Sequence, residues 1–136
     1  MKRDGTMIKT IHVVGAVIIE NGKILCAQRG HGKILPLKWE FPGGKIEEGE
    51  SAETAIKREI MEEMKCKIDI IKQIDFTIYE YDFGTVYLTT FLCSLEEGVP
   101  LLTEHNEIKW LLPKELKTLD WAPADLPTVE KIAAME

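Results

Sequence analysis

Apolar residues along the chain are arranged in runs that predict mainly strands, paired as hairpins. Residues 8–19 form a nearly continuous apolar run rich in β-branched side chains, which favours a buried strand. The pair Asn21-Gly22 follows it, a strong signal for a tight turn, and residues 23–29 return as a second strand. The other predicted strands are a second hairpin at 68–81 and 85–95, a short piece at 39–41 closed by a turn at 42–44, and a last strand at 108–112. The two glycines in 42–44 allow the backbone to approach another part of the structure closely.

Two segments have the pattern of helices. Residues 52–64 contain neither Gly nor Pro, and Ser51 before them is a suitable N-cap. Asp125, with Pro127 just after it, can open a final helix that runs to about residue 134. Strands outnumber helices and do not alternate strictly with them, which differs from a doubly wound sheet. We therefore expect an α+β fold with a mixed β-sheet.

Length and composition indicate one globular domain spanning residues 1–136. The 136 residues are 45% hydrophobic and 29% charged, which is typical of a globule and unlike a disordered chain. No apolar run approaches the roughly 20 residues of a membrane span, and the N-terminal residues do not resemble a signal peptide. We expect a cytoplasmic protein with no membrane partner, and both a monomer and a homodimer remain open.

Cysteine content indicates the redox state of the thiols, and net charge argues against one class of partner. The 3 cysteines, Cys26, Cys66 and Cys93, lie far apart in apolar stretches, which favours buried reduced thiols. A formal net charge of −6 argues against a nucleic-acid polymer as partner, because such binding depends on cationic contacts to phosphates. An anionic small-molecule substrate would need help from metal cations.

The helix predicted at 52–64 carries acidic residues on the face that should be buried. On a helical wheel, Glu59 and Glu63 fall inside the apolar stripe and Glu62 lies at its edge. The stripe itself consists of Ala52, Ala55, Ile56 and Ile60. Burying unpaired carboxylates costs several kcal/mol each, so cations must be nearby.

Two sources of positive charge are available for these carboxylates. Arg58, Lys45 and Lys57 could form salt bridges with them. One arginine is not enough for a cluster that also includes Glu47, Glu48 and Glu50. Hard divalent cations bind carboxylate oxygens, and Mg²⁺ in particular binds through a few carboxylates together with substrate phosphates. A Mg²⁺ site is therefore the favoured interpretation.

The spacing around this helix is Gly44, five residues, Glu50, seven residues, and then the run 58–66. It resembles the signature of the Nudix hydrolases, G-x5-E-x7-R-E-U-x-E-E-x-G-U with U a bulky aliphatic residue, at seven of nine specified positions. The departures are Lys65 in place of the last glycine and Cys66 in the final aliphatic position. That glycine is typical of a left-handed helix C-cap, so Lys65 should cost about 1 kcal/mol of local stability.

The resemblance extends over residues 8–133, and the segments 38–47 and 120–127 are similar to the MutT-type branch. It implies the Nudix fold, an α/β/α sandwich around a mixed sheet. It also implies Mg²⁺-dependent hydrolysis of a nucleoside triphosphate, with Mn²⁺ as a possible substitute, to a nucleoside monophosphate and pyrophosphate. The expected substrate is 8-oxo-dGTP or a CTP-type nucleotide, including dCTP. The alternatives are a dinucleoside polyphosphate, a nucleotide sugar, or a domain that binds nucleotide without hydrolysing it.

The same resemblance assigns roles at the metal site. Metal binding is assigned to Glu59, Glu62 and Glu63, to a backbone carbonyl of Gly43 or Gly44, and to Glu104. Arg58 is expected to orient the glutamates, paired to Glu50. Glu59 is the first choice for the base that takes the proton from water, and Glu104 is the second. His105 beside it is interpreted as a loop residue and not as a ligand, because Mg²⁺ prefers oxygen.

The residues expected to contact the nucleotide are Arg29, Glu40, Phe41, Tyr81 and Asp125. For stacking on the base, Tyr79, Tyr81 and Phe83 are candidates, whereas Trp39, Phe41 and Trp110 are expected mainly in the core. Asp125 matches the position where MutT-type enzymes for oxidised guanine have asparagine. An ionised aspartate only accepts hydrogen bonds, so it should prefer base edges rich in donors. The alternative is that Asp125 merely caps the last helix.

Overall fold

A computed structural model describes residues 2–3, 6–7 and 9–135. The strands are β1 (Lys2–Arg3), β2 (Thr6–Met7), β3 (Thr10–Glu20), β4 (Lys23–Gln28), β5 (Trp39–Glu40), β6 (Gly43–Lys45), β7 (Lys67–Tyr81), β8 (Gly84–Glu97) and β9 (Glu107–Leu111). The helices are α1 (Ala52–Met64) and α2 (Leu126–Ala133), with short 3₁₀ turns η1 (Pro113–Thr118) and η2 (Pro123–Asp125). Ile8, where the first long strand was predicted to begin, lies outside the described residues.

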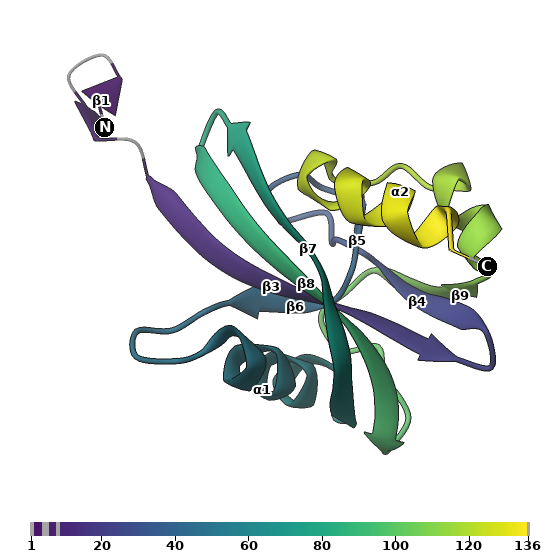
Figure 1. The fold of residues 1–136 in the computed structure, drawn as a ribbon. Helices are drawn as coiled ribbons and strands as arrows, with labels where there is room; N and C mark the ends of the chain where they lie inside the picture. Colours follow the sequence, from purple (N-terminus) through teal and green to yellow (C-terminus); the bar gives the residue numbers. More distant parts are fainter. Residues whose placement is uncertain (1, 4–5, 8, 136) are drawn as a thin grey trace.

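The central sheet is mixed and lies between the two helices. Its strand order is β5-β4-β3-β8-β7, with β6 pairing with β3 and β9 pairing with β4. The β3–β8 pair is parallel, whereas β7 and β8 form the predicted antiparallel hairpin. Figure 1 shows α1 on one face of the sheet and α2 on the other. This arrangement confirms the expected α+β fold, an α/β/α sandwich around a mixed sheet.

The first hairpin forms at the Asn-Gly pair. Asn21 has φ 52° and Gly22 has φ 78°, the left-handed values that a tight primed turn requires. Ile19 therefore pairs with Ile24 across the turn, and β3 and β4 run antiparallel. The prediction from this dipeptide is confirmed.

The predicted turn at residues 42–44 is wrong, because Gly43–Lys45 forms strand β6 and pairs with β3. The pairing sets Gly44 opposite Val14 and brings the two backbones unusually close. A Cβ on Gly43 would lie only 1.9 Å from the Val14 carbonyl oxygen. The close backbone approach expected of the two glycines is therefore confirmed, and the change of direction is not.

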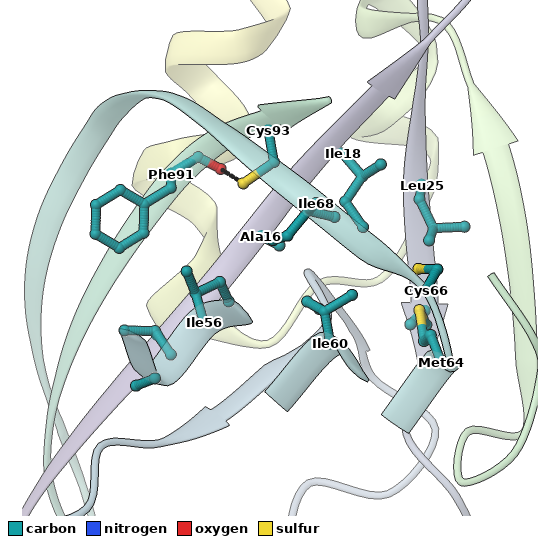
Figure 2. Packing of buried hydrophobic residues seen from close by; sticks show 13 residues of the cluster. Ala16, Ile18, Leu25, Ile56, Ile60, Met64, Cys66, Ile68, Phe91 and Cys93 are labelled. Atoms are coloured by element: carbon teal, nitrogen blue, oxygen red, sulfur yellow. Dashed lines mark hydrogen bonds between the residues drawn. The ribbon is translucent and has the colours of Figure 1, made fainter. Parts of the chain in front are cut away.

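Two apolar clusters cover the two faces of the sheet. On the α1 side, Figure 2 shows Ile56, Ile60 and Met64 of the helix packed toward Ile18 and Phe91 of the sheet. The cluster on the α2 side contains Trp39, Phe41, Trp121 and Val129, as expected for the first two. Trp110 is half-buried against the α1 side, and the three cysteines are buried free thiols. Among the described residues, no helix has the length and apolar character to cross a membrane.

Helix α1 begins and ends as the sequence predicts. The Ser51 Oγ atom accepts a hydrogen bond from the Thr54 amide at 3.1 Å, which caps the N-terminus. At the other end Lys65 has φ 57° and ψ 36°, the left-handed conformation for which glycine is usual. Lysine at this position keeps the C-cap geometry, so the departure from the motif does not displace the acidic face of the helix.

Candidate active site

Arg58 bonds both to acidic side chains of the site and to the backbone of the sheet. Its Nε atom lies 2.7 Å from Glu50 Oε2 and its Nη1 atom lies 2.9 Å from Glu59 Oε2. Its Nη2 atom donates to the Lys45 carbonyl at 3.0 Å, which ties α1 to β6. The expected Arg58–Glu50 pair is present, and its hydrogen bonds lower the pKa of Glu50 to about 2. Arg58 is thereby held in place and fixes the Glu59 carboxylate.

The Glu59 carboxylate lies directly against Gly44. A Cβ at Gly44 would be 2.3 Å from Glu59 Cδ, so this position has no room for a side chain while Glu59 keeps its place. The Glu59 side chain is only 15% exposed, and burial raises the pKa of its carboxyl. Glu59 is therefore confined between the arginine and the glycine backbone.

Glu63 is a buried carboxylate without enough partners. Its Oε1 atom is buried and has no hydrogen-bond partner, whereas the Gly43 amide donates to the carboxylate. Burial, together with the negative charges of Glu40, Glu59 and Glu104, raises the pKa of Glu63 to about 8. Such a group is costly unless a cation or a proton compensates it.

Glu62 lies in a different environment from the other two glutamates. Its side chain is 58% exposed and its Oε1 atom lies 3.2 Å from Arg58 Nη1, an exposed contact one turn along the helix. The wheel placed Glu62 at the edge of the stripe, which agrees with this position. Its role as a metal ligand stays a prediction.

The acidic residues fit a hard divalent cation by their chemistry. Glu63 offers a buried oxygen with no partner, and the carboxylates of Glu40, Glu59 and Glu104 add negative charge around it. Oxygen donors of this kind are the ligands that Mg²⁺ and Mn²⁺ prefer. Within residues 9–135, no three His, Cys, Asp or Glu side chains are already gathered as a compact metal cluster.

A cavity of about 350 Å³ opens beside the acidic face. Glu40, Glu63 and Glu104 line it, together with the predicted backbone position Gly43. Part of its apolar lining comes from β3, the β7–β8 hairpin and η2, namely Ile11, Val13, Tyr81, Phe83, Val86, Leu88 and Ala124. The cationic side chains Lys9, Arg29, Lys33 and Lys45 also line it. The cavity thus offers carboxylates, cations and an apolar surface, which suits a small molecule with a phosphate chain and a flat ring.

Glu40 connects Arg29 with His105 at this cavity. Arg29 Nη1 lies 2.8 Å from Glu40 Oε1, and His105 Nε2 lies 2.9 Å from Glu40 Oε2. The His105 side chain is 7% exposed, so tertiary packing buries the side chain of this loop residue. No sequence pattern indicates this contact, because 65 residues separate the two partners.

Two aromatic residues of the β7–β8 hairpin, Tyr81 and Phe83, line the cavity. The Tyr81 ring packs against Tyr79 at 4.6 Å and stacks on Phe83 at 4.8 Å between centroids. The Tyr81 hydroxyl accepts a hydrogen bond from the Ala124 amide at 2.8 Å. Tyr81 therefore ties the hairpin to the η2 turn, where Asp125 follows.

Asp125 faces the cavity and does not cap the final helix. Its Oδ1 atom accepts a hydrogen bond from the Phe41 amide at 3.1 Å, and no side-chain cap bond forms at α2. The capping interpretation is therefore wrong, since the η2 turn already leads the chain into the helix. Asp125 is 7% exposed, and burial raises its pKa well above the usual range.

Comparisons with known proteins agree with the motif. A family model of the NUDIX domain matches residues 9–132. The chain is 33% identical over 128 residues to the CTP pyrophosphohydrolase of Escherichia coli K12, covering 94% of this chain and 95% of that protein. It is 34% identical over 119 residues to the 8-oxo-dGTP diphosphatase of the same strain, covering 88% and 92%.

A solved structure provides a further match. It is the solution NMR structure of the DNA mismatch repair protein MutT, family Nudix hydrolase, from methicillin-resistant Staphylococcus aureus 252. The two chains are 54% identical, with a TM-score of 0.77 and coverage of 93% of this chain and 97% of that one.

Proposed function

The chain belongs to the Nudix hydrolase family, and from this premise we propose that it is a metal-dependent nucleoside triphosphate pyrophosphohydrolase. The observation that carries the proposal is the buried, unpartnered oxygen of Glu63 on a cavity that also has cationic and apolar lining. A buried carboxylate in that state fits a cation-assisted reaction on phosphates. The products would be a nucleoside monophosphate and pyrophosphate.

Different residues would bind the metal and accept the proton in this reaction. Glu59, Glu63 and Glu104 would hold Mg²⁺ or Mn²⁺, with Glu62 and the carbonyls of Gly43 or Gly44 as further candidates. A bound cation of this kind supplies charge neutralisation for phosphate oxygens. Glu59 accepts the proton from the attacking water, because Arg58 and the backbone at Gly44 hold its carboxylate in one position beside the other acidic residues. Glu104 is the second choice.

Release of pyrophosphate from a panel of nucleotides tests the proposal. With Mg²⁺ present, 8-oxo-dGTP, dCTP and CTP should yield pyrophosphate, whereas chelation of the metal should stop the reaction. Cleavage of dinucleoside polyphosphates or nucleotide sugars alone would favour another Nudix substrate class. Nucleotide binding without cleavage would favour a non-catalytic domain and overturn the proposal.

Divalent cations should stabilise the protein in the absence of substrate. A cation relieves repulsion among Glu59, Glu63 and Glu104 in the folded state only, so it shifts unfolding by mass action. At a metal concentration about 100 times the dissociation constant, the expected gain is about 2.7 kcal/mol. The melting temperature measured with and without Mn²⁺ or Mg²⁺ checks this, with the Glu59→Gln, Glu63→Gln double variant as control. An equal rise in that variant would place the metal elsewhere.

For the base, Asp125 is the proposed reader. It faces the apolar part of the cavity beside Phe41, and Tyr81 holds the neighbouring turn. A neutral carboxyl donates and accepts, as the asparagine of the MutT-type branch does, whereas an ionised one favours donor-rich edges such as the amino group of cytosine. We rank 8-oxo-dGTP slightly ahead of CTP, dCTP or a 5-substituted dCTP.

Replacing Asp125 should change stability and base choice in separable ways. Because burial raises its folded pKa, wild-type stability falls as pH rises from about 4 through that pKa, so Asp125→Asn should have the higher melting temperature at pH 8. This advantage should vanish near pH 4.

In competition assays Asp125→Ala should remove the preference of the enzyme among nucleobases. If the carboxyl acts in its neutral form, Asp125→Asn should still prefer 8-oxo-dGTP over the cytosine nucleotides. An unchanged ranking in Asp125→Ala would exclude Asp125 as a reader.

We also propose that the protein works in the cytoplasm, since its three cysteines are buried free thiols.

A further inference from the structure

The loop that carries Glu104 is anchored on both sides of that residue. Before it, the Thr103 hydroxyl donates to the carbonyl oxygen of Glu63 on α1. After it, the Asn106 amide donates to the Gln28 carbonyl at 2.8 Å, and the two side chains share a hydrogen bond of 2.7 Å. Glu104 itself is exposed and lines the cavity. The loop is therefore tied to α1 and to β4 while Glu104 stays available.

His105 provides a third contact that holds this loop, and its side chain is buried. Its Nε2 atom bonds Glu40 Oε2 at 2.9 Å, although the neighbouring residues Glu104 and Asn106 are exposed. Glu40 cannot turn away, because Arg29 holds its other oxygen at 2.8 Å. Arg29 is fixed in turn by a 2.6 Å hydrogen bond from its Nε atom to the Ile34 carbonyl. A side chain buried between exposed neighbours and bonded to a fixed partner determines which way those neighbours point.

We propose that His105 is a positioning residue that, through Glu40, aims Glu104 into the cavity beside Glu63. The inference rests on the proposed function, since it assigns Glu104 a part in the reaction. One oxygen of Glu40 contacts Arg29 and the other contacts His105, so Glu40 is the fixed partner of this anchor. His105 acts through Glu104 and touches no reacting atom.

Two amide substitutions that differ by one methylene test the anchor. The amide of His105→Gln reaches about as far as Nε2 and can still donate to Glu40, whereas that of His105→Asn is too short. His105→Asn should lower kcat about 10- to 100-fold, with KM for the nucleotide changed less than about threefold. His105→Gln should restore kcat to within about threefold of wild type. Equal kcat in wild type and His105→Asn would overturn the proposal.

A double-variant cycle separates positioning from a general loss of structure. In a Glu104→Gln background, His105→Asn should lower kcat by no more than about twofold, because the group that it positions is already gone. The same 10- to 100-fold loss in that background would mean that His105 acts by another route, and would refute the inference.

Hydrogen exchange of the metal-free protein gives a readout that does not depend on turnover. His105→Asn should speed exchange of the amides at 103–106, whereas His105→Gln and the helix α1 should exchange as in wild type. Unchanged exchange at 103–106 would contradict the anchor. If wild type releases no pyrophosphate, the proposed function fails, while this measurement still decides whether His105 holds the loop.

Discussion

Replacing Glu63 by Gln should abolish most of the turnover and at the same time make the metal-free protein more resistant to heat. The variant keeps the shape of the side chain but removes the charge, so kcat should fall by about 100-fold or more. The Oε1 position is unpartnered in wild type, and the uncharged amide is easier to bury there than a carboxylate. Loss of activity and gain of stability in one substitution is the signature of a strained functional group.

The stability effect has a definite pH dependence. The pKa of Glu63 is about 8 in the folded protein against 4.5 for a free carboxyl, so the folded state holds the proton more tightly. Stability contributed by the protonated form is therefore lost as pH rises from about 4.5 to about 8. Glutamine does not titrate, so melting temperatures of the two proteins should agree near pH 4.5 and diverge toward pH 8.

A control on the same helix makes the result specific. Glu53 lies exposed in the first turn of α1, away from the cavity, and Glu53→Gln should leave kcat unchanged within about twofold. Glu59→Gln should lower kcat as Glu63→Gln does, because Glu59 is the proposed proton acceptor. Near-normal turnover in both Glu59→Gln and Glu63→Gln would show that the acidic face of α1 has no part in the reaction.

Residues whose environment is set within one helix were predictable from sequence. The wheel alone placed Glu59 and Glu63 on the buried face and Glu62 at its edge, because the helical period fixes their directions. The left-handed Lys65 followed from the motif in the same way. The face of the helix on which each residue lies depends only on its position within α1, although the partners that it meets there come from other segments.

Residues whose environment is set by distant segments were not predictable. The His105 side chain is buried where β5 brings Glu40 to it. Asp125 occupies the N-cap position of α2, but its side chain accepts from the Phe41 amide, 84 positions away, and not from the helix. Strand β6 was mistaken for a turn, because a glycine pair is compatible both with a bend and with close strand approach. Only the three-dimensional neighbour, here Val14, distinguishes the two.

The adjacent glycines of β6 should respond in opposite ways to the same substitution. An alanine at 44 would place its Cβ 2.3 Å from Glu59 Cδ, the far end of a flexible side chain that can turn aside. Gly44→Ala should therefore fold and keep most of its stability. Its kcat should fall about 100-fold, because a displacement of about 1 Å at a reacting group is enough for such a loss.

An alanine at 43 would clash with backbone atoms, which cannot turn aside as a side chain can. Its Cβ would lie 1.9 Å from the Val14 carbonyl oxygen and 3.0 Å from Gly15 Cα, so β6 must separate from β3. Gly43→Ala should lose about 3 kcal/mol or more of unfolding free energy, measured by denaturant titration beside Gly44→Ala. Similar losses of stability in both variants would contradict the β3–β6 register. Full turnover in Gly44→Ala would mean that the position of the Glu59 carboxylate does not matter to the chemistry, which would transfer the role of base to Glu104.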